Sequence, residues 1–262
     1  MAENPYAPLP GASTPPPPRG EGDVPSDVAG AVGHAWRMYW NDPVTLTIGV
    51  LLAGVLQAVP VVIVLAILFA GGSLDPEDPR LNQYVTVATV LGLFWSPLFT
   101  GGLSRFVLTA ARGESAQVYQ IFGEVAQYPR FLVWTLVAGG PGILMSIAVT
   151  GTAALGQAEV SAILGILASV VNFGVWIVMA LGPITGQYHV IDRELPAVDA
   201  IIASWKEAEG ARAHALVMTI AMTLVTFLGA LACGVGACAS APIGMIIAAT
   251  LYLQIRGRYR GE

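Results

Sequence analysis

Charged side chains are scarce in this sequence. Only 11% of the 262 residues are Asp, Glu, Lys or Arg, whereas a water-soluble domain carries about 25%. Hydrophobic residues make up 55% of the chain, and the mean hydropathy is +0.68. A chain with so few charges lacks the polar atoms to cover a surface in water, which excludes an ordinary soluble domain.

Residues that carry catalysis and metal binding are equally scarce. The chain has two Cys and three His, and they form no cluster with metal-site spacing. A P-loop, a G-x-S-x-G elbow and an H-E-x-x-H motif are all missing from the sequence. We therefore predict a non-enzymatic protein with no catalytic residues, metal, cofactor or nucleic-acid partner. The one candidate for an enzyme site is His189, which lies three residues before Asp192 on the same helix face. A polar helix end explains this pair equally well.

Charge is absent altogether from five long stretches of the chain. A helix needs roughly 20 apolar residues to cross a bilayer, so four stretches fit one span each. The fifth, residues 213–255, fits two, and the Gly-rich segment 233–242 inside it is typical of a turn. The sequence thus predicts an all-α membrane protein with six transmembrane helices. The predicted spans are about 44–71, 83–106, 131–154, 160–188, 213–233 and 237–256.

Residues 1–25 differ from the rest in composition. They hold eight of the eighteen prolines and almost nothing apolar to bury. This composition predicts a disordered, Pro-rich cytoplasmic tail ahead of a membrane domain over residues 26–262. A polar start has no apolar h-region, so we expect the first span to act as the insertion signal.

The basic residues predict the orientation. Eleven of the twelve Lys and Arg residues precede span one, follow span six, or lie between spans two and three or four and five. Only Arg80 lies in a loop of the other set. The positive-inside rule then places the N-terminus and the C-terminus in the cytoplasm.

An apolar spacing of i, i+3, i+4, i+7 recurs ahead of each pair of spans. The three sets with this spacing are Val28, Ala31, Val32 and Ala35; Val118, Ile121, Phe122 and Val125; and Val198, Ile201, Ile202 and Trp205. We predict three hairpin repeats, each preceded by a cytoplasmic amphipathic helix that lies at the membrane interface. Ordinary loop helices packed on one another are the alternative.

Prolines and cysteines add two further predictions. Pro97, Pro183 and Pro242 lie inside spans two, four and six, where they predict helix breaks. Broken helices at corresponding places can mark a transport site, although they are also frequent in bundles that transport nothing. Cys233 and Cys238 fall in an outer turn, where a disulfide and two small buried side chains are equal alternatives.

The C-terminal half carries a recognisable pattern. Its parts are Asp192-Arg193, the segment 200–205, the Gly-rich segment 228–236, Ala241-Pro-Ile and Leu251-Tyr252. Over residues 95–255 the chain resembles a broad group of uncharacterised bacterial six-span proteins, related to the membrane domain attached to some glycerophosphodiester phosphodiesterases. The resemblance implies a bacterial inner-membrane location. It does not imply phosphodiesterase activity, because the catalytic domain is absent from the sequence.

Two functional hypotheses follow. The first is a non-enzymatic membrane module that organises membrane lipids, or protein partners at the cytoplasmic face, through its interfacial helices. The second is a passive channel or small-solute transporter that uses the Pro- and Gly-broken helices. Away from their ends, the predicted spans carry no charged side chain of the kind that ion-coupled carriers usually place inside the bundle, which argues against a coupled mechanism.

Overall fold

The computed structural model describes residues 25–70, 79–154, 158–231 and 235–260. Within these ranges every regular element is a helix and no strand occurs, which confirms the predicted all-α class. The predicted tail, apart from Pro25, and Cys233 lie outside the described residues. The helices in chain order are α1 Val28–Asn41, α2 Pro43–Ala70, α3 Pro79–Trp95, α4 Pro97–Ala111, η1 Val118–Phe122, η2 Val125–Gln127, α5 Tyr128–Ala154, α6 Ala158–Ala180, η3 Pro183–Thr185, α7 Gly186–Asp192, α8 Ala197–Glu207, α9 Arg212–Leu231 and α10 Val235–Arg260.

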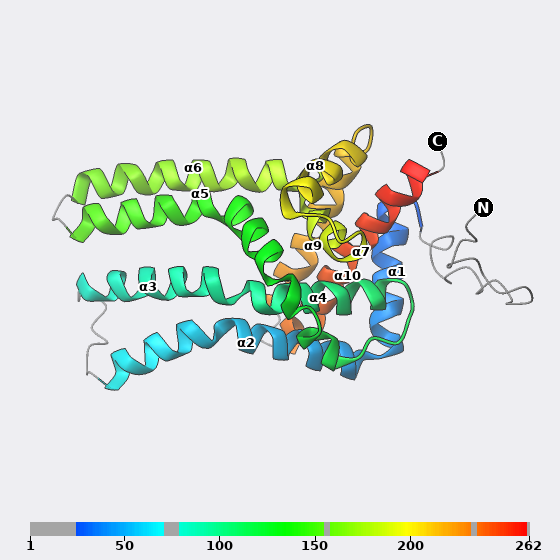
Figure 1. The fold of residues 1–262 in the computed structure, drawn as a ribbon, viewed down its shortest axis with the longest axis horizontal. Coiled ribbons are helices and arrows are strands. Elements are labelled where there is room, and N and C mark those ends of the chain that lie inside the picture. Colours follow the sequence, from blue (N-terminus) through cyan, green and yellow to red (C-terminus); the bar gives the residue numbers. More distant parts are fainter. Residues whose placement is uncertain (1–24, 71–78, 155–157, 232–234, 261–262) are drawn as a thin grey trace, which may run out of the picture.

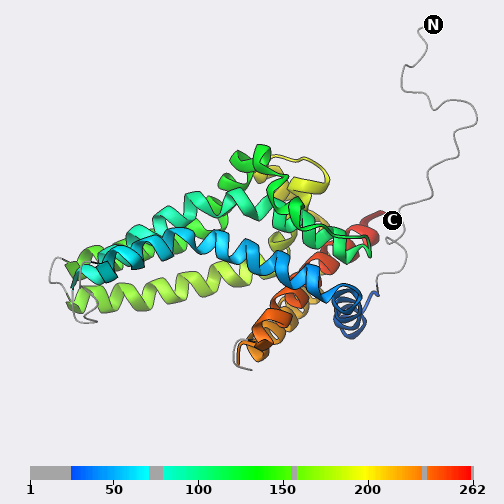
Figure 2. The same ribbon diagram turned by 90° about the horizontal axis from the view of Figure 1, so that it is seen from below.

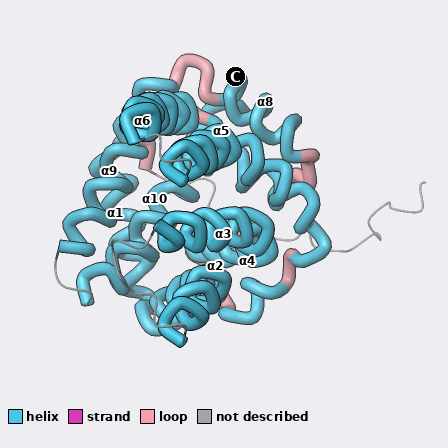
Figure 3. The backbone as a smooth tube through the Cα atoms, turned by 90° about the vertical axis from the view of Figure 1, so that its left-hand side faces the viewer, coloured by secondary structure: helices cyan, strands magenta, loops and turns pink. Residues whose placement is uncertain are grey.

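Three antiparallel pairs of long helices dominate the fold: α2 with α3, α5 with α6, and α9 with α10. The first two pairs extend side by side from a cluster of shorter helices (Figure 1). The α9–α10 pair leaves that cluster at an angle to the others (Figure 2). Viewed toward the tips of the first two pairs, α6, α5, α3 and α2 form one curved row (Figure 3). We call the cluster the head; it comprises α1, α4, η1, η2, α7 and α8 with the adjoining ends of α9 and α10.

Several of the long helices suit a membrane. Four segments are long and apolar enough to cross one, namely Pro43–Leu68, Glu159–Ala180, Arg212–Leu231 and Gly236–Gly257. Helices α3 and α4, bent by 54° at their junction, would together make a fifth crossing. Only 6% of the residues in the α6 segment are buried, so this apolar helix needs a surrounding other than water. The structure is thus compatible with a multi-pass helical membrane protein, and the predicted number of six stays a prediction.

The core lies in the head, around the second half of α10. Ile246, Ile247, Leu251, Tyr252 and Ile255 of this helix are all buried, and α10 contacts α1, α2, α4 and α9. Helix α10 is therefore the element that ties the α9–α10 pair to the first part of the chain.

The predicted helix over residues 118–125 is wrong in its type. The chain there forms two short 3-10 helices, η1 and η2, instead of one amphipathic α-helix. The backbone of η1 lies directly on α4, where a Cβ atom at Gly102 would overlap the Ile121 carbonyl oxygen. Ile121 is fully buried by this contact. Close backbone packing on Gly102 thus takes the place of a regular helix. The other two predicted stripes lie on α-helices, α1 and α8.

Two of the three prolines predicted to break helices lie at breaks. Pro97 begins α4 at the 54° bend, and Pro183 begins η3 between α6 and α7. The predicted helix break at Pro242 is wrong, because α10 continues through this residue. Helix α9 packs so closely there that a Cβ at Gly229 would overlap the Ser240 hydroxyl oxygen. Such packing against a neighbouring helix supports a continuous helix around a proline.

Pro60 leaves a backbone carbonyl without its helical partner, and a side chain from another helix supplies the missing donor. Because proline has no N–H, the Leu56 carbonyl four residues earlier loses its usual hydrogen bond. The indole N–H of Trp95, at the end of α3, donates to that carbonyl at 2.6 Å. Nearby, the Tyr128 hydroxyl donates to the carbonyl of Phe94 at 3.0 Å. The part of α2 before Pro60, the end of α3 and the start of α5 are thus joined by these two hydrogen bonds.

Replacing Trp95 with Phe removes the donor to Leu56 and should lower the free energy of unfolding by about 1 kcal/mol. In a Pro60→Ala background the backbone N–H of the introduced alanine can serve the same carbonyl, so the Trp95→Phe change should then cost less. Unfolding in mixed detergent micelles measures both differences. Trp176→Phe, at an indole that stacks on Phe173, is the matched control and should have little effect. Equal losses in the two backgrounds would contradict the assigned role of Trp95.

Candidate functional site

Helix α8 has an outer apolar face and an inner face of small and polar residues. Its Val198 side chain is 52% exposed and Ile202 is 46% exposed, while Ile201 and Trp205 are half-buried. The inward positions are Ala197, Ala200, Ser204 and Glu207. The apolar side chains predicted to line one face therefore point partly away from the protein, where they need an apolar environment or a partner.

The inner face of α8 is joined to the end of α7 through contacts of the Glu207 side chain. Buried Glu207 accepts a hydrogen bond from Arg193 Nη1 at 2.5 Å. Its other carboxylate oxygen lies 3.4 Å from Nε2 of His189. Near the C-terminus of α8, the Arg212 guanidinium lies 4.3 Å from the ring centre of Trp205, a cation–π contact. The orientation of α8 is therefore set by charged contacts, which leave its apolar face outward.

Helix α1 is arranged in a similar way. Its buried side includes His34, whose Nε2 lies 2.9 Å from the carbonyl oxygen of Ala111 in α4, and Tyr39, whose hydroxyl hydrogen-bonds with Thr47. Its two tryptophans, Trp36 and Trp40, are exposed. The helix begins with an Asp27 cap that accepts from the Gly30 N–H.

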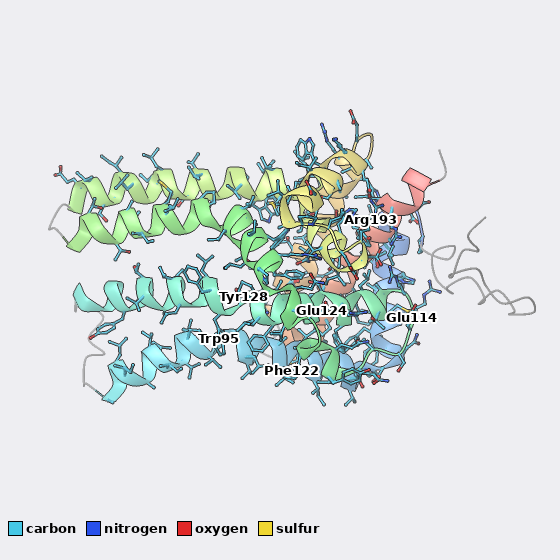
Figure 4. All side chains as sticks on the ribbon, in the orientation of Figure 1. Trp95, Glu114, Phe122, Glu124, Tyr128 and Arg193 are labelled. Atoms are coloured by element: carbon cyan, nitrogen blue, oxygen red, sulfur yellow. The ribbon has the colours of Figure 1, made fainter. Side chains whose placement is uncertain are left out.

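The remaining predicted apolar stripe, residues 118–125, lies on the 3-10 helices η1 and η2 and is only partly exposed. Phe122 and Val125 are exposed, Val118 is half-buried and Ile121 is buried. Phe122 lies on the opposite edge of the head from Arg193, which precedes α8 (Figure 4). The three apolar surfaces are thus distributed around the head and do not form one patch.

Beneath α8, the ends of three helices from different parts of the chain meet at one carboxylate. Asp192, the last residue of α7, accepts from Arg112 Nη2 at 2.6 Å and from the Tyr252 hydroxyl at 2.6 Å. Arg256, one turn after Tyr252 in α10, forms an ion pair with Oδ2 of Asp192, the oxygen that also accepts from Tyr252, whereas Arg112 binds Oδ1. Arg112 caps the end of α4. These four residues, which we call the Asp192 cluster, join α4, α7 and α10.

His189 lies beside the Asp192 cluster and is completely buried. Its ring stands edge-on to the Tyr252 ring, with 4.9 Å between ring centres. Burial, followed by the positive charges of Arg193 and Arg256, lowers the pKa of His189 to about 4. Arg193 already neutralises nearby Glu207, so the imidazole is neutral at pH 7.

His189 and Asp192, the one candidate enzyme site that the sequence offered, face different partners. Asp192 is held by Arg112, Arg256 and Tyr252, whereas His189 faces Glu207. Among the described residues no hydrogen bond joins the two side chains. The arrangement is that of a structural charge network.

Sequence reasoning missed the partners of Asp192, because they come from distant segments. One signal was present: Arg112 and Asp192 are 80 residues apart, the same interval that separates the second and third apolar stripes. Residues at equivalent places in two proposed repeats therefore pair with each other.

The remaining predicted site residues do not join this network. Cys238 is half-buried near the start of α10, and its proposed partner lies outside the described residues. Across the part of the chain that the structure describes, no three His, Cys, Asp or Glu side chains come together as a metal site would require. Comparison of the chain with protein-family models, curated proteins and solved structures gives no match in any of the three.

Asp192→Ala should destabilise the fold by about 3–5 kcal/mol, because it takes the shared counter-charge away from two mostly buried guanidinium groups. The free energy of unfolding in mixed micelles measures this loss. Asp199→Ala, at an exposed carboxylate on α8, removes the same charge from the surface and should change stability little. Similar values for the two variants would show that the Asp192 cluster does not hold the head together.

Acidification should destabilise the protein through His189. Its pKa is about 4 in the folded state, against the ordinary value of 6.5 for histidine, so the unfolded chain binds more protons between these values. The contribution is complete above pH 6.5 and is lost as the pH falls, by about 2 kcal/mol between pH 7 and pH 5. His189→Gln should lose much less stability over this interval, as followed by unfolding at both pH values. If His189→Gln loses as much stability as the wild type over this interval, another group controls the pH dependence.

Proposed function

We propose that the chain is a non-enzymatic module of the bacterial inner membrane that organises lipids or partner proteins through the apolar surfaces of its cytoplasmic head. The observation that carries this proposal is the two-sided character of α8. Its inner face is fixed by Glu207 and small residues, while Val198 and Ile202 point outward. Moving the exposed half of each side chain out of water contributes about 1 kcal/mol.

The distribution of basic residues supports the proposed orientation. Helices α1, α4, α7 and α8 lie at one end of the molecule (Figure 1). They contain or adjoin four basic residues, Arg37, Arg112, Arg193 and Lys206. The C-terminal half of α10 packs with α1 at the same end. An end rich in arginine favours the cytoplasmic side.

The packing of α1 and α8 favours the membrane interface over ordinary loop packing. Helix α8 packs on α5, α7 and η3, and α1 packs on α10, α9 and α4. Each helix is thus covered on its inner side by the head, and its outward tryptophan or aliphatic side chains suit the headgroup boundary.

The contacts at the helix breaks argue against the passive-channel alternative. A broken helix that lines an aqueous path leaves its backbone groups to water or solute. At the break beside Pro97, the Phe94 carbonyl accepts from Tyr128 and the Ser96 carbonyl accepts from Thr100. These bonds satisfy the carbonyls of Phe94 and Ser96 within the protein.

The double variant Val198→Ser/Ile202→Ser should lose associated lipids or proteins while its insertion and stability stay unchanged, because both side chains are exposed. Mass spectrometry of the molecules that co-purify in native-lipid discs measures the association, and we expect at least a threefold loss. Asp199→Ser, an exposed polar change on the same helix, is the matched control. If the double variant keeps the full wild-type complement, α8 is not the working surface.

A further inference from the structure

A preformed apolar groove of about 520 Å³ opens beside the break between α3 and α4. Helices α2, α3 and α4 and the first residue of α5 form its walls. Their lining side chains include Pro60, Ile63, Leu91, Trp95, Leu98 and Tyr128. Pro60 of α2 and the 54° bend between α3 and α4 both lie at this opening.

The two aromatic walls of this groove are held in place. Trp95 is fixed by its hydrogen bond to Leu56, and Tyr128 by its bond to Phe94. The polar atoms of both rings are thus used within the protein, so the surface left for an occupant is hydrocarbon. A rigid, apolar site of this volume is within the range of small-molecule pockets, and it lies along the apolar segment of α2.

A cation, Arg105, lies beyond the lining residues of the groove, further along α4 toward the head. Leu98 and Arg105 are seven residues apart on α4, hence on the same face and about 10 Å apart along the helix. Arg105 forms an ion pair with Glu124, yet its side chain remains 56% exposed while that of Glu124 is buried. A guanidinium has five N–H donors, so Arg105 retains outward donors for an anion. Trp95, Tyr128 and Glu124 follow one another from the long helices into the head (Figure 4).

We propose that this groove is a binding site for one membrane phospholipid, with an acyl chain between α2 and α3 and the phosphate on Arg105. Hydrocarbon walls beside an arginine at the head match the two parts of such a lipid, and the planar guanidinium binds phosphate in a bidentate manner. The groove is separate from the α8 surface, so the tests of lipid binding in the groove are independent of the tests of the proposed function.

Photolabelling of the wild-type protein tests the acyl-chain half of the site. A phosphatidylglycerol with a diazirine on its acyl chain is incorporated into discs with the full-length protein. We expect labelled peptides from 59–63 and 91–98 at several times the yield from α6, whose Ile166 is 68% exposed to the same bilayer. Labelling spread evenly over α6 and the groove would overturn the proposal, since the groove would then hold only bulk lipid.

Variants test both halves after detergent purification, by native mass spectrometry of the lipid that each chain retains. Ile63→Trp and Leu91→Trp fill the groove from opposite walls and should each reduce retained phospholipid at least fivefold. Ile166→Trp, the same kind of change on α6, should not. The double variant Arg105→Gln/Glu124→Gln removes the guanidinium without leaving Glu124 as an unpaired charge, and it should reduce the retained phospholipid severalfold. Unchanged retention in the filling variants, a retained molecule without phosphate, or full retention in the Arg105 variant would each overturn the assignment.

Discussion

The carboxylate of Asp192 is the point on which the arrangement of helices depends. It binds Arg112 from α4, Arg256 and Tyr252 from α10, and is itself the end of α7. These three helices belong to the three successive parts of the chain that each contain a pair of long helices. Two mostly buried arginines around one aspartate depend on it, because removal of the carboxylate takes the counter-charge away from both. The charges therefore fix how the three parts of the chain meet.

The rest of the head follows from the same constraint. Arg193 follows Asp192 directly and holds Glu207, which turns the small and polar side of α8 inward. Val198 and Ile202 are then left outside. In the long helices, Trp95 and Tyr128 satisfy carbonyls near Pro60 and Pro97. These carbonyls are thus satisfied within the protein while many apolar side chains face outward, an arrangement that suits a bilayer.

Where sequence reasoning failed, a contact between distant segments was responsible. The apolar spacing at 118–125 is a genuine signal for a helix, but Gly102 lets the backbone of η1 lie directly on α4 and a tighter form results. Proline is a genuine helix breaker, but α10 continues through Pro242, where it packs closely against α9. His189 and Asp192 share a helix face as expected, yet each finds its partner on a different element.

The sequence by itself determined the all-α class, the apolar segments and the positions of α1 and α8, because chain composition and helical period are local properties. It also predicted the side of the membrane from eleven basic residues. Only the tertiary structure decided which charges meet at Asp192, which way α8 faces, and where Pro60 and the α3–α4 break leave a groove. These depend on contacts between residues far apart in the chain, such as Arg112 with Asp192 and Trp95 with Leu56, and no local pattern encodes such pairs.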